Sequence, residues 1–173
     1  MSSSAATELA GRLEGTYQAF GEYLSGLTPE QWRARCGNHP TIRVGDQDES
    51  RPVGTVAYHT AAAPPRMLRL LRAIRTGEDF PRPDPARNAQ QAREHPDPEQ
   101  AETVALAQRN GAEAAEVVRG LSDEDLAVTG STPFGELSVA EVVRRILIGH
   151  VVWHEGSIRA TLGHPLETAQ PAS

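Results

Sequence analysis

Hydrophobic residues recur every three or four positions in four separate stretches of this chain, which is the period of an α-helix with one buried face. No stretch shows the sustained alternation of hydrophobic and polar residues that is typical of a half-buried β-strand. The pattern therefore predicts an all-α protein with four long helices, at about residues 7–24, 52–75, 98–121 and 138–162.

Capping residues mark where the first and fourth helices begin and end. We expect Thr7 to cap the first helix, and Ser138 to cap the fourth in a capping box with Glu141. Gly163, with Pro165 two residues later, ends the fourth helix. A core-facing row in this helix is formed by Val139, Val142 or Val143, Ile146, His150, His154 and Ile158.

Two short helical turns with similar sequences follow the first and third long helices. Thr28 caps one of them, with Pro29 at its first position and Gln31 one residue short of a capping box. Ser122 caps the other, with Asp125 as its third residue. The third long helix also carries a stripe of small residues around Gly111, which allows a neighbouring helix to approach closely.

Proline and glycine interrupt the pattern between the helices. Pro64 and Pro65 remove helical hydrogen bonds and clash with the preceding turn, so we expect a kink or break just past His59. Residues 37–52 and 130–135 are predicted as loop and turn, and the tail from residue 164 as frayed. The proline-rich segment 77–98 is predicted to be an irregular crossover connection that spans a helix bundle.

Length and composition limit the classes of function. The 173 residues fit one domain, residues 1–173, with an ordered core at about 7–163. The 17 Lys and Arg against 23 Asp and Glu argue against a nucleic-acid partner. No apolar run reaches the ~20 residues of a membrane span, and no secretory signal is visible, so we expect a cytoplasmic protein. The single cysteine, Cys36, is interpreted as a bystander.

Three histidines carry the candidate chemistry. His150 and His154 are four residues apart in the most apolar stretch of the chain, so they lie on the same helix face. His59 lies on the core-facing stripe of the second helix. Three imidazoles and an open position are typical of a catalytic metal centre. The alternative is that these three are ordinary core histidines. The other histidines, His39, His95 and His164, are expected to be exposed.

The histidine pair does not match the sequence motif of a zinc protease. Such enzymes need H-E-x-x-H, with the glutamate as general base, whereas Val151 follows His150. Glu155 is better placed as an acceptor behind the ligands or as a surface charge. We assign no catalytic role to Tyr58, Trp153, Glu155 or Arg159, and no catalytic side chain is predicted beyond a metal-bound water or thiolate.

The order and separation of these motifs resemble the DinB-like superfamily, which includes maleylpyruvate isomerase N-terminal type domains and bacterial low-molecular-weight-thiol S-transferases. The resemblance covers residues 7–163 and rests on three segments: 53–59, which ends at His59, the turn 121–126, and 138–143 leading into His150-x-x-x-His154. It implies an up-up-down-down style four-helix bundle in which His59, His150 and His154 hold a divalent metal, usually zinc or nickel.

The resemblance also implies what the metal would do. In the thiol-transferase members it would activate a thiol cofactor as a thiolate for attack on an electrophile. The Ala-, Arg- and Gly-rich composition suggests an actinobacterial source, which favours mycothiol over bacillithiol or another low-molecular-weight thiol. The first hypothesis is thus a metal-dependent S-transferase or isomerase that joins a small-molecule electrophile and a thiol cosubstrate.

Two alternatives stay open beside this hypothesis. One is a thiol-independent hydrolase, or another enzyme that modifies small molecules at the same metal. The other is a non-enzymatic helical interaction module. A homodimer is compatible with the sequence.

Overall fold

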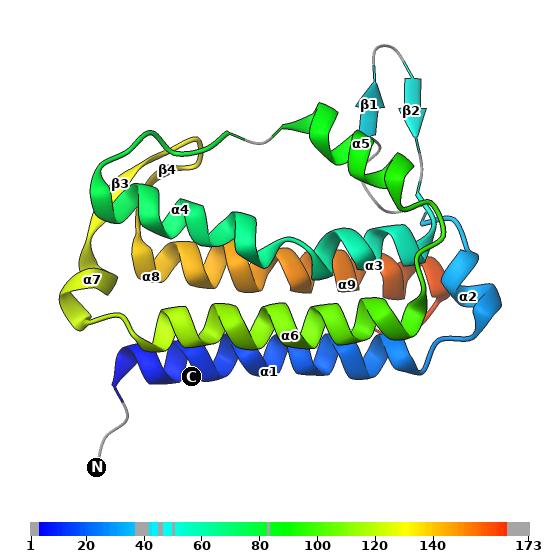
Figure 1. The fold of residues 1–173 in the computed structure, drawn as a ribbon, viewed down its shortest axis with the longest axis horizontal. Helices are drawn as coiled ribbons and strands as arrows, with labels where there is room; N and C mark the ends of the chain where they lie inside the picture. Colours follow the sequence, from blue (N-terminus) through cyan, green and yellow to red (C-terminus); the bar gives the residue numbers. More distant parts are fainter. Residues whose placement is uncertain (1–3, 37–41, 45–46, 50, 83, 166–173) are drawn as a thin grey trace.

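The computed structural model describes residues 4–36, 42–44, 47–49, 51–82 and 84–165. Four helical rods lie side by side and form a bundle (Figure 1). The rods are α1 (Ala5–Ser25), α3 (Val53–Ala61) continued by α4 (Pro64–Thr76), α6 (Gln100–Arg119), and α8 (Val139–Val142) continued by the π-helical segment η1 (Val143–Ile148) and α9 (Gly149–Leu162). The predicted helix bundle is confirmed.

The connections contain three short helices and two antiparallel hairpins, and the hairpins are elements that the sequence pattern did not reveal. The helices are α2 (Pro29–Arg33), α5 (Pro85–Glu94) and α7 (Asp123–Ala127). The hairpins pair β1 (Ile42–Val44) with β2 (Gln47–Glu49), within the predicted loop, and β3 (Thr129–Thr132) with β4 (Gly135–Ser138). The expected fraying at 166–173 lies outside the described residues.

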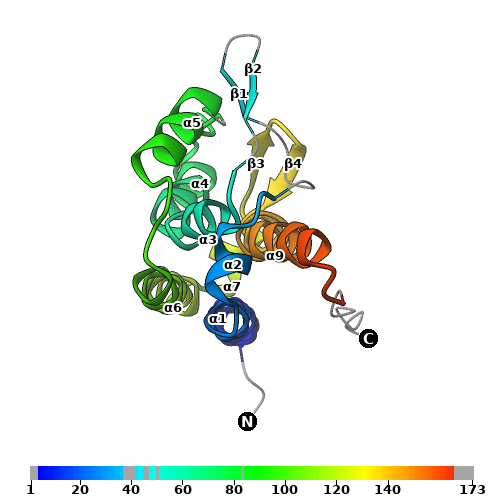
Figure 2. The same cartoon turned by 90° about the vertical axis from the view of Figure 1, so that its right-hand side faces the viewer.

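The direction of the rods differs from the expectation. α1 and the α8–α9 rod run one way, while α3–α4 and α6 run the other way (Figure 1). The order is therefore up-down-down-up, and the expected up-up-down-down order is wrong. The reason lies in the connections, since α2 and the α7–β3–β4 segment each reverse the chain at one end of the bundle. The segment with α5 is the long crossover connection, and it makes α6 parallel to α3–α4 (Figures 1 and 2).

The contact between α1 and α6 depends on small residues. A Cβ added at Gly111 would lie 2.3 Å from the Cβ of Tyr17, and one added at Gly21 would lie 3.1 Å from the Gln108 side chain. Tyr17 is almost fully buried, and burial raises the pKa of its hydroxyl. The small residues on α6 thus allow the close approach that the sequence predicted.

The predicted caps of α2, α7 and α8 and the glycine that ends α9 are confirmed, whereas the Thr7 cap of α1 and the incomplete capping box of α2 are wrong. Capping boxes at α7 and α8 and the left-handed glycine that ends α9, Gly163 (φ 67°), are as expected. α1 begins earlier than predicted, because the Ser4 hydroxyl accepts the Thr7 amide at 3.2 Å. Pro29 is the first residue of α2, so Gln31 is its third, and the capping box with Thr28 is complete.

The predicted break after His59 is confirmed, and it has its own hydrogen bonds. Neither residue of the Pro64–Pro65 pair has an N–H, so the carbonyls of Thr60 and Ala61 lose their helical donors. The Ala63 amide donates to Thr60 at 3.3 Å instead, and the side-chain amide of Asn110 on α6 donates to Ala61 at 2.9 Å. The second helix therefore ends close to His59, and both carbonyls that the prolines deprive of a helical donor have another one.

The crossover connection was predicted to be irregular, but it contains the ten residues of α5. Asp84 caps this helix by accepting the Arg87 amide at 3.1 Å. Its far end is held against α3, because the Thr55 hydroxyl donates to the carbonyl of His95 at 3.0 Å and the rings of Tyr58 and His95 stack 3.9 Å apart. These contacts hold α5 over the part of α3 that carries His59.

The fourth rod is less regular than the predicted continuous α-helix. In η1 the Gly149 amide donates to the carbonyl of Arg144, five residues earlier. Such a segment contains one residue more than an α-helix of the same length, so it rotates the following residues. Leu147 and Val151 are accordingly buried, while Ile146, which was predicted to face the core, is only partly buried. No helix within the described residues is long and apolar enough to cross a membrane.

Candidate metal centre

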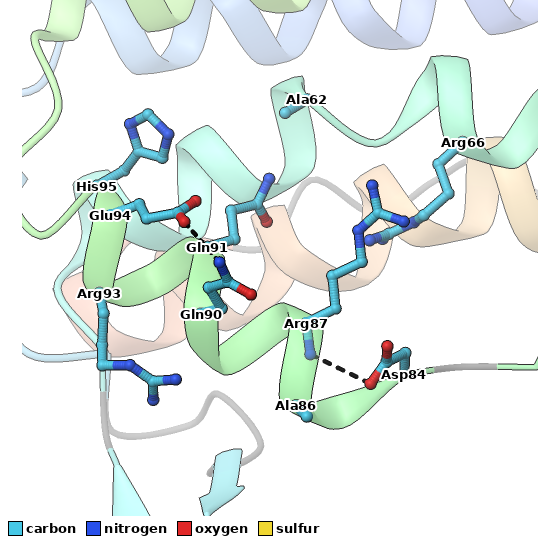
Figure 3. A pocket seen from close by; sticks show the side chains of 10 residues that line it. All are labelled: Ala62, Arg66, Asp84, Ala86, Arg87, Gln90, Gln91, Arg93, Glu94 and His95. Carbon is cyan, nitrogen blue, oxygen red and sulfur yellow. Dashed lines mark hydrogen bonds between the residues drawn. The ribbon is translucent and has the colours of Figure 1, made fainter.

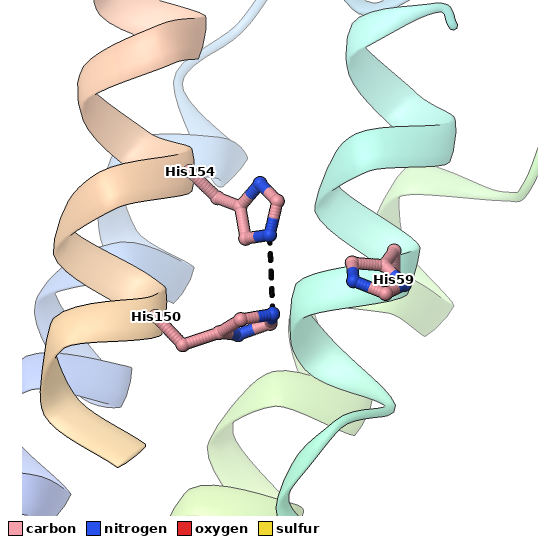
Figure 4. A group of neighbouring side chains, drawn as sticks. All are labelled: His59, His150 and His154. Atoms are coloured by element: carbon pink, nitrogen blue, oxygen red, sulfur yellow. Dashed lines mark hydrogen bonds between the residues drawn. The ribbon is translucent and has the colours of Figure 1, made fainter. Parts of the chain in front are cut away.

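His59 on α3 and the pair His150 and His154 on α9 point toward one another across the gap between these two helices (Figure 4). Each offers a ring nitrogen, and the three nitrogens lie within 4.8 Å of one another. His59 and His154 are 5% and 2% exposed, and His150 is half-buried. The structure thus brings together the three histidines that the sequence selected.

Hydrogen bonds indicate which nitrogen of His59 faces the cluster. Its Nδ1 lies 2.8 Å from Oε1 of Gln91. Because an amide oxygen only accepts hydrogen bonds, Nδ1 carries the proton, and the lone pair is on Nε2. Nε2 of His154 lies 3.1 Å from Nε2 of His150, so these two nitrogens already face each other.

The arrangement fits a divalent ion. Bonds of 2.0–2.1 Å to a tetrahedral ion place ligand nitrogens about 3.3 Å apart. One pair already has nearly this spacing, and the 4.8 Å limit on the others requires only small side-chain rotations. Imidazole ligands suit zinc, nickel, copper and iron. In the described part of the chain, this is the single group of three or more His, Cys, Asp or Glu residues with such geometry.

Gln91 is the residue of this site that the sequence analysis missed. It lies on α5, in the segment predicted to be irregular, and nothing in the local sequence distinguishes it from the adjacent Gln90. Gln91 also lines a cavity of about 720 Å³ between α5 and the α3–α4 break (Figure 3). It therefore connects the histidine cluster to a neighbouring hollow.

The polar residues near the pair in sequence have other contacts. Glu155 accepts a 2.7 Å hydrogen bond from Arg159, and the Arg159 guanidinium lies 4.0 Å from the centre of the Tyr23 ring. Burial raises the pKa of the Tyr23 hydroxyl, and the nearby arginine acts in the opposite direction. The Trp153 ring is half exposed and meets His154 edge-on at 4.8 Å. Glu155 thus forms an ion pair with Arg159, which agrees with the expectation that Glu155 is not the general base.

The remaining histidines and Cys36 stay outside the cluster wherever the structure describes them. His95 stacks on Tyr58, and His164 lies 3.0 Å from the Tyr23 hydroxyl, so both are half-buried and the expectation of exposure is wrong for them. His39 lies outside the described residues. Cys36 is fully buried, with its Sγ 3.7 Å from a main-chain carbonyl of α9, which agrees with the bystander interpretation.

Comparison with known proteins agrees with this architecture. YfiT from Bacillus subtilis, described as a probable metal-dependent hydrolase with an unusual four-helix bundle topology, has a similar fold with a TM-score of 0.64. The alignment covers 95% of this chain and 91% of YfiT at 15% sequence identity. Among the curated proteins, none matches the sequence. Residues 12–157 match the sequence profile of the DinB superfamily, which confirms the resemblance seen in the motifs, and the chain belongs to this superfamily.

Proposed function

We propose that this protein is a metal-dependent enzyme in which His59, His150 and His154 hold a divalent ion, zinc or nickel. The observation that carries the proposal is the convergence of three ring nitrogens from two facing helices within 4.8 Å. When bound, the ion would supply Lewis-acid chemistry, lowering the pKa of a thiol or water brought against it.

The residues of the chain would contribute position and shielding. Gln91 holds the His59 ring with Nε2 toward the other two histidines. Burial of His59 and His154 keeps water away from their side of the cluster, whereas the half-buried His150 marks the side open to substrate. With three nitrogen ligands and no carboxylate in the cluster, a coordination position is left for the reacting group.

The reaction we propose is transfer of a low-molecular-weight thiol of the mycothiol type to a small-molecule electrophile, or an isomerisation that uses such a thiol. Glu155, the acidic residue next to the ligand His154, is paired with Arg159. Among the described residues, no carboxylate joins the three histidines, so the metal itself would have to ionise the nucleophile. A thiol with an ordinary pKa of about 8.5 needs a far smaller shift than water, at about 15.7. The sequence motifs shared with thiol-transferase members of the superfamily also support this choice.

Hydrolysis without a thiol is the second candidate. It is favoured by the description of the structural relative YfiT as a probable metal-dependent hydrolase. The two reactions separate in one assay, because turnover that requires a low-molecular-weight thiol supports the transferase, and thiol-independent cleavage supports the hydrolase.

The metal itself is tested by elemental analysis of protein purified without an affinity tag. We expect a stoichiometric divalent metal in the wild type and in His164→Ala, whose histidine contacts Tyr23 and Gln31 instead of the cluster. His150→Ala should lose the metal, and chelation should lower the melting temperature of the wild type. A metal-free wild type whose melting temperature is unchanged by chelation would contradict the proposal and favour the non-enzymatic module.

A further inference from the structure

Charged side chains line the cavity beside the metal centre. It lies between α5 and the end of α3, and two of its lining residues belong to the neighbourhood of the site (Figure 3). Gln91 bonds to His59, and Ala62 lies three residues after His59. A small molecule in this hollow is therefore separated from the metal ligand His59 by one layer of side chains.

Three arginines line the cavity, Arg66 from α4 and Arg87 and Arg93 from α5. Arg66 is partly buried, and its Nη1 donates to Oδ1 of Asn88 at 3.2 Å, which fixes one edge of the guanidinium. Burial lowers the pKa of Arg66, and so do the positive charges of Arg87 and Arg69, while the nearby Asp84 carboxylate acts in the opposite direction. Among the described residues, no carboxylate forms an ion pair with Arg66 or Arg87, so their charge is available to a ligand.

The amount of charge indicates the kind of anion. Asp84 and Glu94 also line the cavity, so its charged side chains carry one net positive charge. Such a cavity suits a singly charged group better than a phosphate dianion, which the two carboxylates would repel. The planar fork of an arginine matches a carboxylate, with two parallel hydrogen bonds.

We propose that this cavity binds the carboxylate of a small organic acid, with Arg66 and Arg87 as its charged partners. That the acid is the substrate of the metal centre rests on the proposed function.

Titration of the full-length, isotope-labelled protein with benzoate, followed by NMR shifts, tests this assignment. We expect saturable binding, with benzamide, the neutral molecule of the same shape, at least about tenfold weaker. Arg87→Gln and Arg66→Gln should each weaken benzoate binding about tenfold. Arg72→Gln, which removes the same charge from an exposed residue of α4 that pairs with Glu78, should bind benzoate like the wild type.

A further variant distinguishes benzoate binding in the cavity from benzoate binding at the metal centre. His150→Ala, expected to lose the metal, should keep its benzoate affinity, which would hold whether or not the proposed enzymatic function is correct. Benzoate binding that disappears in His150→Ala but survives in both arginine variants would place the carboxylate on the metal and overturn the proposal. Tighter binding of inorganic phosphate than of benzoate would overturn it as well.

Discussion

Replacing Gln91 with leucine should weaken binding of a divalent metal about 10- to 100-fold, the usual cost of removing a hydrogen-bond partner behind a ligating histidine. The substitution removes the Oε1 that accepts the Nδ1 proton of His59 at 2.8 Å and leaves a side chain of similar size. The three ligand nitrogens themselves are untouched.

The magnitude follows from what the hydrogen bond selects. Without it, His59 can carry its proton on Nε2 or turn its ring, and neither state offers a lone pair to the ion. A buried hydrogen bond contributes about 0.5–1.5 kcal/mol, so its loss alone approaches a tenfold effect. The rest of the range comes from lower basicity of the ring once its partner is gone. His59 is 5% exposed, so water replaces the lost amide poorly.

The assay is competition for Zn²⁺ against a chromophoric chelator, with wild type and variants at equal concentration. Gln90→Leu is the matched control, because Gln90 is the next residue on α5, is exposed, and bonds to Glu94 instead of to a histidine. Gln91→Glu keeps an acceptor oxygen and should retain wild-type affinity or bind more tightly. Equal zinc affinities for Gln91→Leu and Gln90→Leu would refute the positioning role.

Three further predictions concern the scaffold. Gly111→Ala places a methyl group 2.3 Å from the Tyr17 Cβ and should lower the free energy of unfolding, measured in urea, by about 1–3 kcal/mol. Gly15→Ala, with open space around it, should raise the free energy of unfolding by up to about 1 kcal/mol. Equal effects of the two substitutions would contradict the packing argument. Asn110→Ala leaves the last α3 carbonyl without its donor and should cost about 1–3 kcal/mol in the same measurement; an unchanged midpoint would show that the break does not need it. Deleting Arg145, an exposed residue of η1, should turn this segment into α-helix, because η1 holds one surplus residue. The zinc stoichiometry and the melting temperature should stay at wild-type values. A loss of zinc or a lower melting temperature would contradict this view of η1.

The buried positions of the three histidines were predictable from local signals, while their joining in one metal site was implied by the resemblance to the superfamily. The spacing of His150 and His154 fixes their relation on any α-helix, and the apolar stripe of the second helix identifies the buried side on which His59 lies. The break at Pro64 follows from the missing N–H groups of proline alone. Each of these inferences needs only the residues of one helix.

The parts that escaped prediction depend on contacts between distant segments. Ala89 is the single buried residue of α5, so this helix has no apolar stripe to detect, and it is held by Thr55 and Tyr58 of α3. Gln91 became visible as a site residue only once these contacts had placed it. The direction of the rods likewise depends on which connection crosses the bundle, which hydrophobic periodicity does not determine.

The π-helical segment explains how α9 can supply both core residues and ligands. If the helix that begins at Val139 were α-helical throughout, His150 would point to the same side as Val139, into the centre of the bundle. The surplus residue in η1 turns everything after it back by about 100°. Val151 and Ile158 then occupy the centre, both fully buried, while His150 moves to the half-buried edge and His154 turns toward α3. By accommodating the surplus residue, η1 therefore keeps the pair directed at His59, which itself lies two residues before the end of α3. A departure from regular α-helix thus lies close to the ligands on both helices, at η1 before His150 and at the proline pair after His59.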